Sequence, residues 1–135
     1  MVDAYLDTSA AMKLVMAENG SAEIVEVLDD PHRRVAASWL LHTELHCAAG
    51  RRPSDISHTR LQAVLERTLL VDLVRSDLLT AGTLAPLRSQ DAIHLAVALR
   101  LGVQEMITYD RELAEAAARA GLRVLSPGAS SDSDG

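Results

Sequence analysis

Several residue types are scarce in this chain of 135 residues, and their scarcity excludes some classes of protein. Phenylalanine is absent and the only aromatic residues are Tyr5, Trp39 and Tyr109, so aliphatic side chains and methionine must form the core. The single cysteine, Cys47, excludes an internal disulfide and indicates a reducing compartment. No apolar run approaches the roughly 18 residues of a membrane span, and the first residues lack the pattern of a signal peptide. We therefore expect a soluble, cytoplasmic protein.

Basic residues are fewer than acidic ones, which gives a formal net charge of −6. Affinity for phosphates comes largely from basic side chains, so this balance disfavours a purely electrostatic nucleic-acid binder. All but one of the 13 basic residues are arginine, the exception being Lys13. Arginine suits bidentate phosphate contacts better than lysine does. A GC-rich genome gives the same bias, so composition leaves the question of a nucleic-acid partner open.

Short apolar runs alternate with amphipathic segments along the chain. The runs predict strands at 2–6, 34–37, 69–74, 105–109 and 123–125. The amphipathic segments predict helices at 10–17 (ending at Asn19-Gly20), 21–28, 39–49, 55–67, 76–84, 89–101 and 110–119. This alternation predicts an α/β fold, a three-layer α/β/α sandwich around a short parallel sheet. We expect one domain over 1–126 and a disordered tail over 127–135, which is small, polar and acidic.

Four acidic residues occupy positions where a charge needs a partner. Asp7 and Asp110 follow predicted strands, at the sheet edge where open parallel sheets bind ligands. Asp91 lies in the first turn of a helix that is apolar on almost every side, and Glu44 lies mid-helix among apolar residues. Burying an unpaired charge is costly. If the four acids converge, their oxygens suit Mg²⁺ or Mn²⁺, which can activate water for attack on a phosphodiester.

Each acid alone also has a structural explanation. Asp7 and Asp110 precede helices, where aspartate is a good N-cap. Asp91 lies in a first helical turn, where the helix dipole favours a negative charge. Glu44 could face solvent from a half-buried helix. Periodicity leaves both interpretations open.

Four stretches occur in a fixed order along the chain: Tyr5–Ala10 (YLDTSA), Leu40–Glu44 (LLHTE), Leu87–Ala96 (LRSQDAIHLA) and Thr108–Leu113 (TYDREL). Together they resemble the signature segments of PIN-domain ribonucleases, and in particular the small VapC-type toxins of bacterial toxin–antitoxin pairs. The resemblance covers about residues 1–126, and it implies the PIN-like form of the predicted sandwich.

The resemblance implies a metal-dependent endoribonuclease. Asp7, Glu44, Asp91 and Asp110 match the acidic quartet of that family, which holds one or two Mg²⁺ or Mn²⁺ ions. By the family's mechanism, metal-bound water attacks an RNA phosphodiester and leaves a 5′-phosphate and a 3′-hydroxyl. Such toxins typically form homodimers, and a cognate VapB-like antitoxin silences them by covering the acidic groove.

Hydroxyl side chains next to these acids are candidates for supporting roles. By the same resemblance, Thr8 or Ser9 would orient ligands or water near Asp7. Thr108 would do the same beside Asp110.

Three arginines are candidates for contacts with the RNA phosphates. Arg88 lies three residues before Asp91 and is the strongest of them. Arg51 and Arg52 adjoin Pro53 in a predicted loop, where a merely solvated turn is an equally good explanation.

Three histidines lie close in sequence to two of these acids, Glu44 and Asp91. His42 and His46 are four residues apart on one helical face, but Glu44 points about 200° away from His42. The H-E-x-x-H order of a zinc site is also absent. His94 lies about 60° around its helix from Asp91, and we expect it to be a packed histidine bonded to the backbone.

Two other classes of function also use acids or the same fold. Receiver-like and dehalogenase-like phosphoryl-transfer domains need a lysine late in the chain, and the only lysine is Lys13. The dehalogenase-type D-x-D is missing as well, because Thr8 and Ser9 follow Asp7. The remaining alternative is a non-catalytic PIN-like module that binds RNA or protein. Three aromatic residues and a negative charge equip the chain poorly for single-strand binding.

Overall fold

The structure, a computed structural model, describes residues 1–16 and 21–129. The described strands are β1 (Ala4–Leu6), β2 (Val35–Ser38), β3 (Leu69–Val71), β4 (Glu105–Ile107) and β5 (Arg123–Leu125). The described helices are α1 (Thr8–Val15), α2 (Ser21–Asp29), α3 (Trp39–Arg51), α4 (His58–Arg67), α5 (Arg75–Ala81), α6 (Ser89–Leu101) and α7 (Arg111–Arg119). The predicted α/β fold is confirmed.

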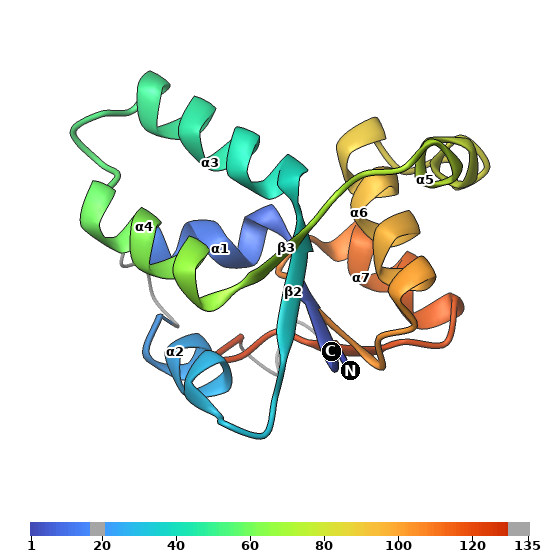
Figure 1. Cartoon of the computed structure of the whole chain (residues 1–135), viewed down its shortest axis with the longest axis horizontal. Coiled ribbons are helices and arrows are strands. Elements are labelled where there is room, and N and C mark those ends of the chain that lie inside the picture. Colours follow the sequence, from blue (N-terminus) through green and yellow to red (C-terminus); the bar gives the residue numbers. More distant parts are fainter. Residues whose placement is uncertain (17–20, 130–135) are drawn as a thin grey trace.

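The five strands form one parallel sheet in the order β3-β2-β1-β4-β5. Helices α1, α3 and α4 lie on one side of it, and α6 and α7 lie on the other (Figure 1). The central strand β1 is fully buried, as expected for a parallel strand that helices cover on both faces. The strand order reverses between β1 and β4. The carboxyl ends of two such strands mark the usual ligand site of an open α/β sheet.

Most element boundaries agree with the sequence-based expectations, and the differences have local causes. The first helix begins at Thr8 rather than Ala10, because the Asp7 carboxylate accepts the backbone hydrogen of Ala10 and caps it. The helix expected from residue 55 begins at His58, after the N-cap Ser57. The expected stop at residues 19–20 lies outside the described residues.

The start of the expected tail is tied to the end of β4. The Ser126 hydroxyl donates to the carbonyl of Thr108 at 2.6 Å, and the Tyr109 hydroxyl donates to the carbonyl of Pro127. Residues 130–135 lie outside the described residues, so the disordered tail stays a prediction. Within the part of the chain that is described, no helix has the length and apolarity needed to cross a membrane.

Candidate active site

Asp7 follows β1 directly, and its side chain is only 2% exposed. It accepts hydrogen bonds from the Thr108 hydroxyl at 2.6 Å, from the Ser9 hydroxyl at 2.8 Å and from the backbone amide of Ala10 at 2.9 Å. Burial raises the pKa of Asp7, and these three donors oppose that effect only in part. The carboxylate is thus held in a fixed orientation at an energetic cost that a nearby cation would relieve.

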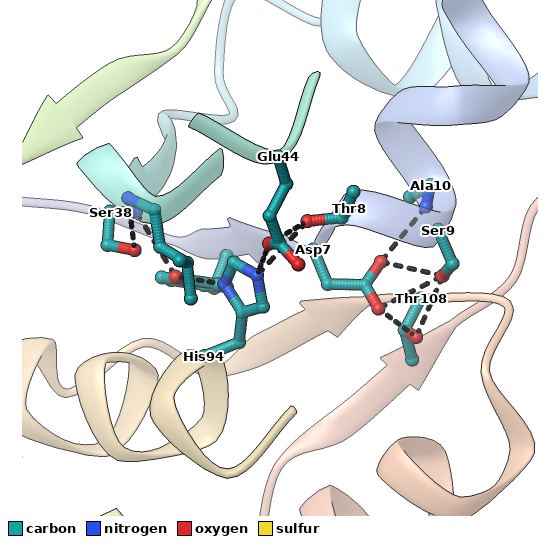
Figure 2. Close-up of polar contacts among 10 residues, drawn as sticks. Asp7, Thr8, Ser9, Ala10, Ser38, Glu44, His94 and Thr108 are labelled. Carbon is teal, nitrogen blue, oxygen red and sulfur yellow. Dashed lines mark hydrogen bonds and ion pairs between the residues drawn. The ribbon is translucent and has the colours of Figure 1, made fainter. Parts of the chain in front are cut away.

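Hydroxyl groups join the end of β1 to the end of β4 (Figure 2). Besides donating to Asp7, Thr108 accepts the backbone hydrogen of Asp110 at 3.0 Å. Ser9 likewise accepts the backbone hydrogen of Tyr109 at 2.9 Å. Asp110 itself caps α7 by accepting the amide of Leu113 at 2.9 Å. Capping therefore uses one oxygen of Asp110, Oδ1.

Asp91 lies in the first turn of α6 and is half-buried. Its pKa is raised, first by burial and then by the negative charges of Asp110 and Asp7, while Arg88 acts in the opposite direction. The carboxylates of Asp7 and Asp110, which follow β1 and β4, are therefore near enough to Asp91 to disfavour its charge. Clustering of like charges at a strand edge is typical of a cation site.

Glu44 projects from α3 toward the end of β1 and is partly buried (Figure 2). Its Oε1 accepts the Thr8 hydroxyl at 2.5 Å and lies 2.7 Å from Nε2 of His94. Burial alone would raise the pKa of Glu44, but the hydrogen bonds from His94 and Thr8 outweigh burial and lower it. Glu44 is therefore held as a carboxylate near Asp7, but with its own partners (Figure 2).

Of the two hydroxyls proposed beside Asp7, Ser9 contacts its carboxylate, whereas Thr8 contacts Glu44, because its position at the first turn of α1 directs the hydroxyl toward α3. One expectation about polar neighbours differs from the structure. His94 does not bond to the backbone: Nδ1 lies 2.7 Å from the Tyr5 hydroxyl, and Nε2 contacts Glu44. Tyr5 was not expected at the site, since its only signal in the sequence is a polar hydroxyl group within an otherwise apolar strand.

The remaining histidines and the three arginines lie at different distances from the acidic site. His42 and His46 stack on each other with ring centroids 4.2 Å apart, on the face of α3 away from Glu44. Arg51 and Arg52 lie about 10 Å beyond Glu44 along the helix axis. Arg88 immediately precedes α6, and its charge acts on Asp91.

The chemistry of these donors fits a hard divalent cation. The available groups are carboxylate oxygens with neighbouring hydroxyls, which Mg²⁺ and Mn²⁺ prefer, and no thiolate or free imidazole accompanies them among the residues named above. Across residues 1–16 and 21–129, no three His, Cys, Asp or Glu side chains are already drawn together as a metal cluster. A divalent cation is favoured here by two features: negative charges act on Asp91, and Asp7 is a buried carboxylate.

Comparison with known protein families shows to which family the chain belongs. The family described as "PIN domain" matches residues 4–119, which is most of the chain. The chain belongs to the PIN-domain family. Among curated proteins, this PIN domain is similar to "Ribonuclease VapC46" of Mycobacterium tuberculosis (strain ATCC 25618 / H37Rv), with 38% identity over 94% of this chain and 99% of that protein. It is 34% identical to "Ribonuclease VapC35" of Mycobacterium tuberculosis (strain CDC 1551 / Oshkosh), over 92% of this chain and 96% of that protein.

Solved structures agree with the PIN fold. Mycobacterium tuberculosis VapC20, described as a sarcin-ricin loop cleaving toxin, has a TM-score of 0.70 at 16% identity, over 93% of this chain and all of that one. A toxin–antitoxin complex from Klebsiella pneumoniae has a TM-score of 0.68 at 20% identity, over 93% of this chain and 98% of that one. At these identities the likeness shows the fold, which is the one predicted from the sequence.

Proposed function

We propose that this PIN domain is a divalent-metal-dependent endoribonuclease that acts as the toxin of a toxin–antitoxin pair. The observation that carries the proposal is the position of Asp7 and Asp110 after the adjacent strands β1 and β4, at the reversal point of the sheet, where both carboxylates act on the charge of Asp91. RNA as the substrate is supported by the curated relatives, which are named ribonucleases. Action in the cytoplasm, by a domain of residues 1–126, is part of the proposal.

The same carboxylates, together with Glu44, would hold Mg²⁺ or Mn²⁺. When bound, such an ion supplies activated water and offsets negative charge on the phosphodiester, which leaves a 5′-phosphate and a 3′-hydroxyl. The hydroxyls of Ser9 and Thr108 keep the Asp7 carboxylate from rotating, and Thr8 does the same for Glu44. Fixed ligand orientation is what such neighbours contribute to a metal site.

Arginines supply the proposed contacts with the RNA backbone. Arg88 is exposed next to Asp91, so its guanidinium can reach a phosphate that lies against the acidic site. Arg51 and Arg52 would contact only a longer RNA, because they lie at the far end of α3. Arg52 also pairs with Asp55 at 3.3 Å.

Two protein partners are part of the proposal. A VapB-like antitoxin is supported by the VapBC complexes among the similar structures, and an acidic groove would attract a basic side chain of such a partner. A homodimer is supported by an exposed apolar surface, the β3–α5 face. This face is formed by Leu69, Leu73, Val74, Leu78 and Leu79. Exposed apolar side chains that lie close together along the chain are typical of an interaction surface.

The first experiment is cleavage of RNA by the purified chain with Mg²⁺, with Mn²⁺ and with a chelator. We expect cleavage that needs a metal and is lost in Asp91→Asn, with 5′-phosphate ends mapped by sequencing. Asp55→Asn is the matched control, because Asp55 is an exposed acid paired with Arg52 at the other end of α3. Equal cleavage by wild type and Asp91→Asn, or none with either metal, would contradict the proposal. RNA binding without cleavage would instead favour the non-catalytic module.

A further inference from the structure

A chain of polar groups crosses the core beneath the acidic site. It runs from the backbone amide of Ser38 to the Tyr5 hydroxyl at 3.1 Å, then to Nδ1 of His94 at 2.7 Å. From Nε2 of the same ring it reaches Oε1 of Glu44 at 2.7 Å. Tyr5, Ser38 and His94 are each at most 1% exposed, so water cannot substitute for any of these partners.

The direction of each hydrogen bond on the Tyr5 side follows from what the groups can do. A backbone amide can only donate, so the Tyr5 oxygen accepts from Ser38. The hydroxyl hydrogen of Tyr5 then has Nδ1 of His94 as its acceptor. Burial raises the pKa of Tyr5 well above its usual range, so this hydroxyl keeps its proton. Nδ1 therefore carries no hydrogen.

The Glu44 side of the ring gives the complementary assignment. A carboxylate can only accept, so Nε2 of His94 must donate to Oε1 of Glu44. The Thr8 hydroxyl donates to the same Oε1, and its oxygen lies 3.1 Å from Nε2, where it can share the ring hydrogen. One form of the ring, with hydrogen on Nε2 alone, satisfies every partner of His94.

We infer that His94 is a positioning residue, set in its Nε2–H form by Tyr5, that fixes Oε1 of Glu44 and reserves Oε2 for the metal site. No described group donates a hydrogen bond to Oε2, whereas Oε1 has two donors. Glutamate has a long, flexible side chain, and two donors to one oxygen restrict the rotation of its carboxylate. The metal part of this inference rests on the proposed function.

The ring form is tested first, without metal. Long-range ¹H–¹⁵N spectra of the full chain should show a pyridine-like Nδ1 and a pyrrole-like Nε2 for His94. In Tyr5→Phe, the Nδ1 resonance should move, because that nitrogen loses its only donor. A hydrogen on Nδ1 in wild type, or an Nδ1 resonance that Tyr5→Phe leaves in place, would overturn the inference. A ring without these two hydrogen bonds would show neither feature.

The role toward Glu44 is tested by the affinity for Mn²⁺, measured by calorimetry without RNA. We expect His94→Leu to weaken Mn²⁺ binding about 10-fold or more, the usual effect of losing a neighbour that orients a ligand. His94→Gln should lose much less, because its amide can still donate to Glu44. His46→Gln, which changes a histidine on the far face of α3, should bind as wild type does.

Each outcome separates the inference from the function on which it rests. A wild-type chain that binds no Mn²⁺ overturns the proposed function, and this role of His94 with it. A wild type that binds Mn²⁺ while His94→Leu binds equally well overturns the inference alone. If His94→Leu does not fold, Tyr5→Phe replaces it, and it too must bind Mn²⁺ more weakly than wild type for the inference to stand.

Discussion

The Thr108 hydroxyl donates a 2.6 Å hydrogen bond to Oδ2 of Asp7, and so joins the carboxyl ends of the adjacent strands β4 and β1. Both side chains are almost completely buried. The bond therefore orients a carboxylate that burial makes costly to ionise, at the centre of the candidate site. Among the donors to Asp7, it is also the shortest.

Replacing Thr108 by valine tests this bond at constant side-chain shape. Thr108→Val removes a donor to Asp7 and an acceptor of the Asp110 amide, and both partners stay buried or half-buried. We expect the free energy of unfolding to fall by about 1–3 kcal/mol, the cost of leaving such groups unpaired. Mn²⁺ affinity should fall about 10-fold. Chemical denaturation and calorimetry measure the two effects.

The matched control is Thr59→Val, since Thr59 is an exposed threonine of α4 on the other side of the molecule. It should change neither quantity. If Thr108→Val bound Mn²⁺ as tightly as wild type, the bond would serve the fold and not the site.

Asp110 separates capping from metal binding. Its one described side-chain hydrogen bond accepts the amide of Leu113, and asparagine caps a helix about as well as aspartate. Asp110→Asn should therefore keep the metal-free melting temperature or raise it slightly, because a charge that repels Asp91 is removed. Asp110→Ala should lose about 1 kcal/mol from the missing cap. Both variants should lose Mn²⁺ binding.

Thermal unfolding without metal and calorimetry with Mn²⁺ measure these outcomes. An Asp110→Asn variant that melts lower than wild type yet binds Mn²⁺ normally would mean that Asp110 is only a cap.

The fold was predictable from the sequence because its signals are local. Apolar-rich runs such as Val2–Leu6 predict parallel strands when helices follow them, and the N-caps Asp7 and Asp110 mark where those helices begin. The ends of the strands were harder: Leu73 and Val74 continue the apolar run of β3 after Asp72, but the chain turns away there toward α5. Apolarity alone does not show where strand pairing stops.

The site was predictable only in part, because its geometry depends on contacts between distant segments. The four acids were singled out by their positions and then by the resemblance, and the effect of Asp7 and Asp110 on the charge of Asp91 agrees with the grouping of those three. The partners of His94 were not, since Tyr5 lies 89 residues away in the sequence. Helical periodicity places His94 relative to Asp91, but it carries no information about which side chains of β1 or α3 the ring meets.

Helix α5 contains a buried ion pair that the hydrophobic pattern of the sequence does not predict. Its one buried residue is Asp77, whose carboxylate accepts two hydrogen bonds from the Arg100 guanidinium, at 2.7 and 3.0 Å. Burial would raise the pKa of Asp77, but the bonds from Arg100 and from the Val74 amide outweigh burial and lower it. The ion pair thus fastens α5 to α6.

Stability at low pH should report this pair. Because the folded chain holds the pKa of Asp77 below the ordinary value of about 3.9, the stabilisation is complete above that pH. It disappears as the pH falls through the lower pKa of the folded state. Arg100→Met should cost about 3 kcal/mol at neutral pH, by leaving a buried carboxylate unpaired, and should flatten or reverse this part of the pH profile.

Urea denaturation between pH 2 and pH 7 measures both quantities. Asp72→Asn is the control, because Arg100 contacts only the backbone carbonyl of that residue. A profile in Arg100→Met that parallels the wild type would show that the pair contributes little.

The exposed leucines of α5 predict the dimer. Leu78 and Leu79 are 53% and 68% exposed, while the same short helix buries an aspartate, so the β3–α5 face is apolar toward solvent. In a two-fold dimer a single substitution on this face acts twice. Since burying one leucine contributes about 1.5–3 kcal/mol, Leu79→Glu should weaken self-association at least about 100-fold.

Light scattering coupled to size exclusion should then give twice the chain mass for wild type and the monomer mass for Leu79→Glu. Val25→Glu, which places the same charge on exposed α2, should remain a dimer. A monomeric wild type at high micromolar concentration, or a dimeric Leu79→Glu, would place the interface elsewhere or remove it.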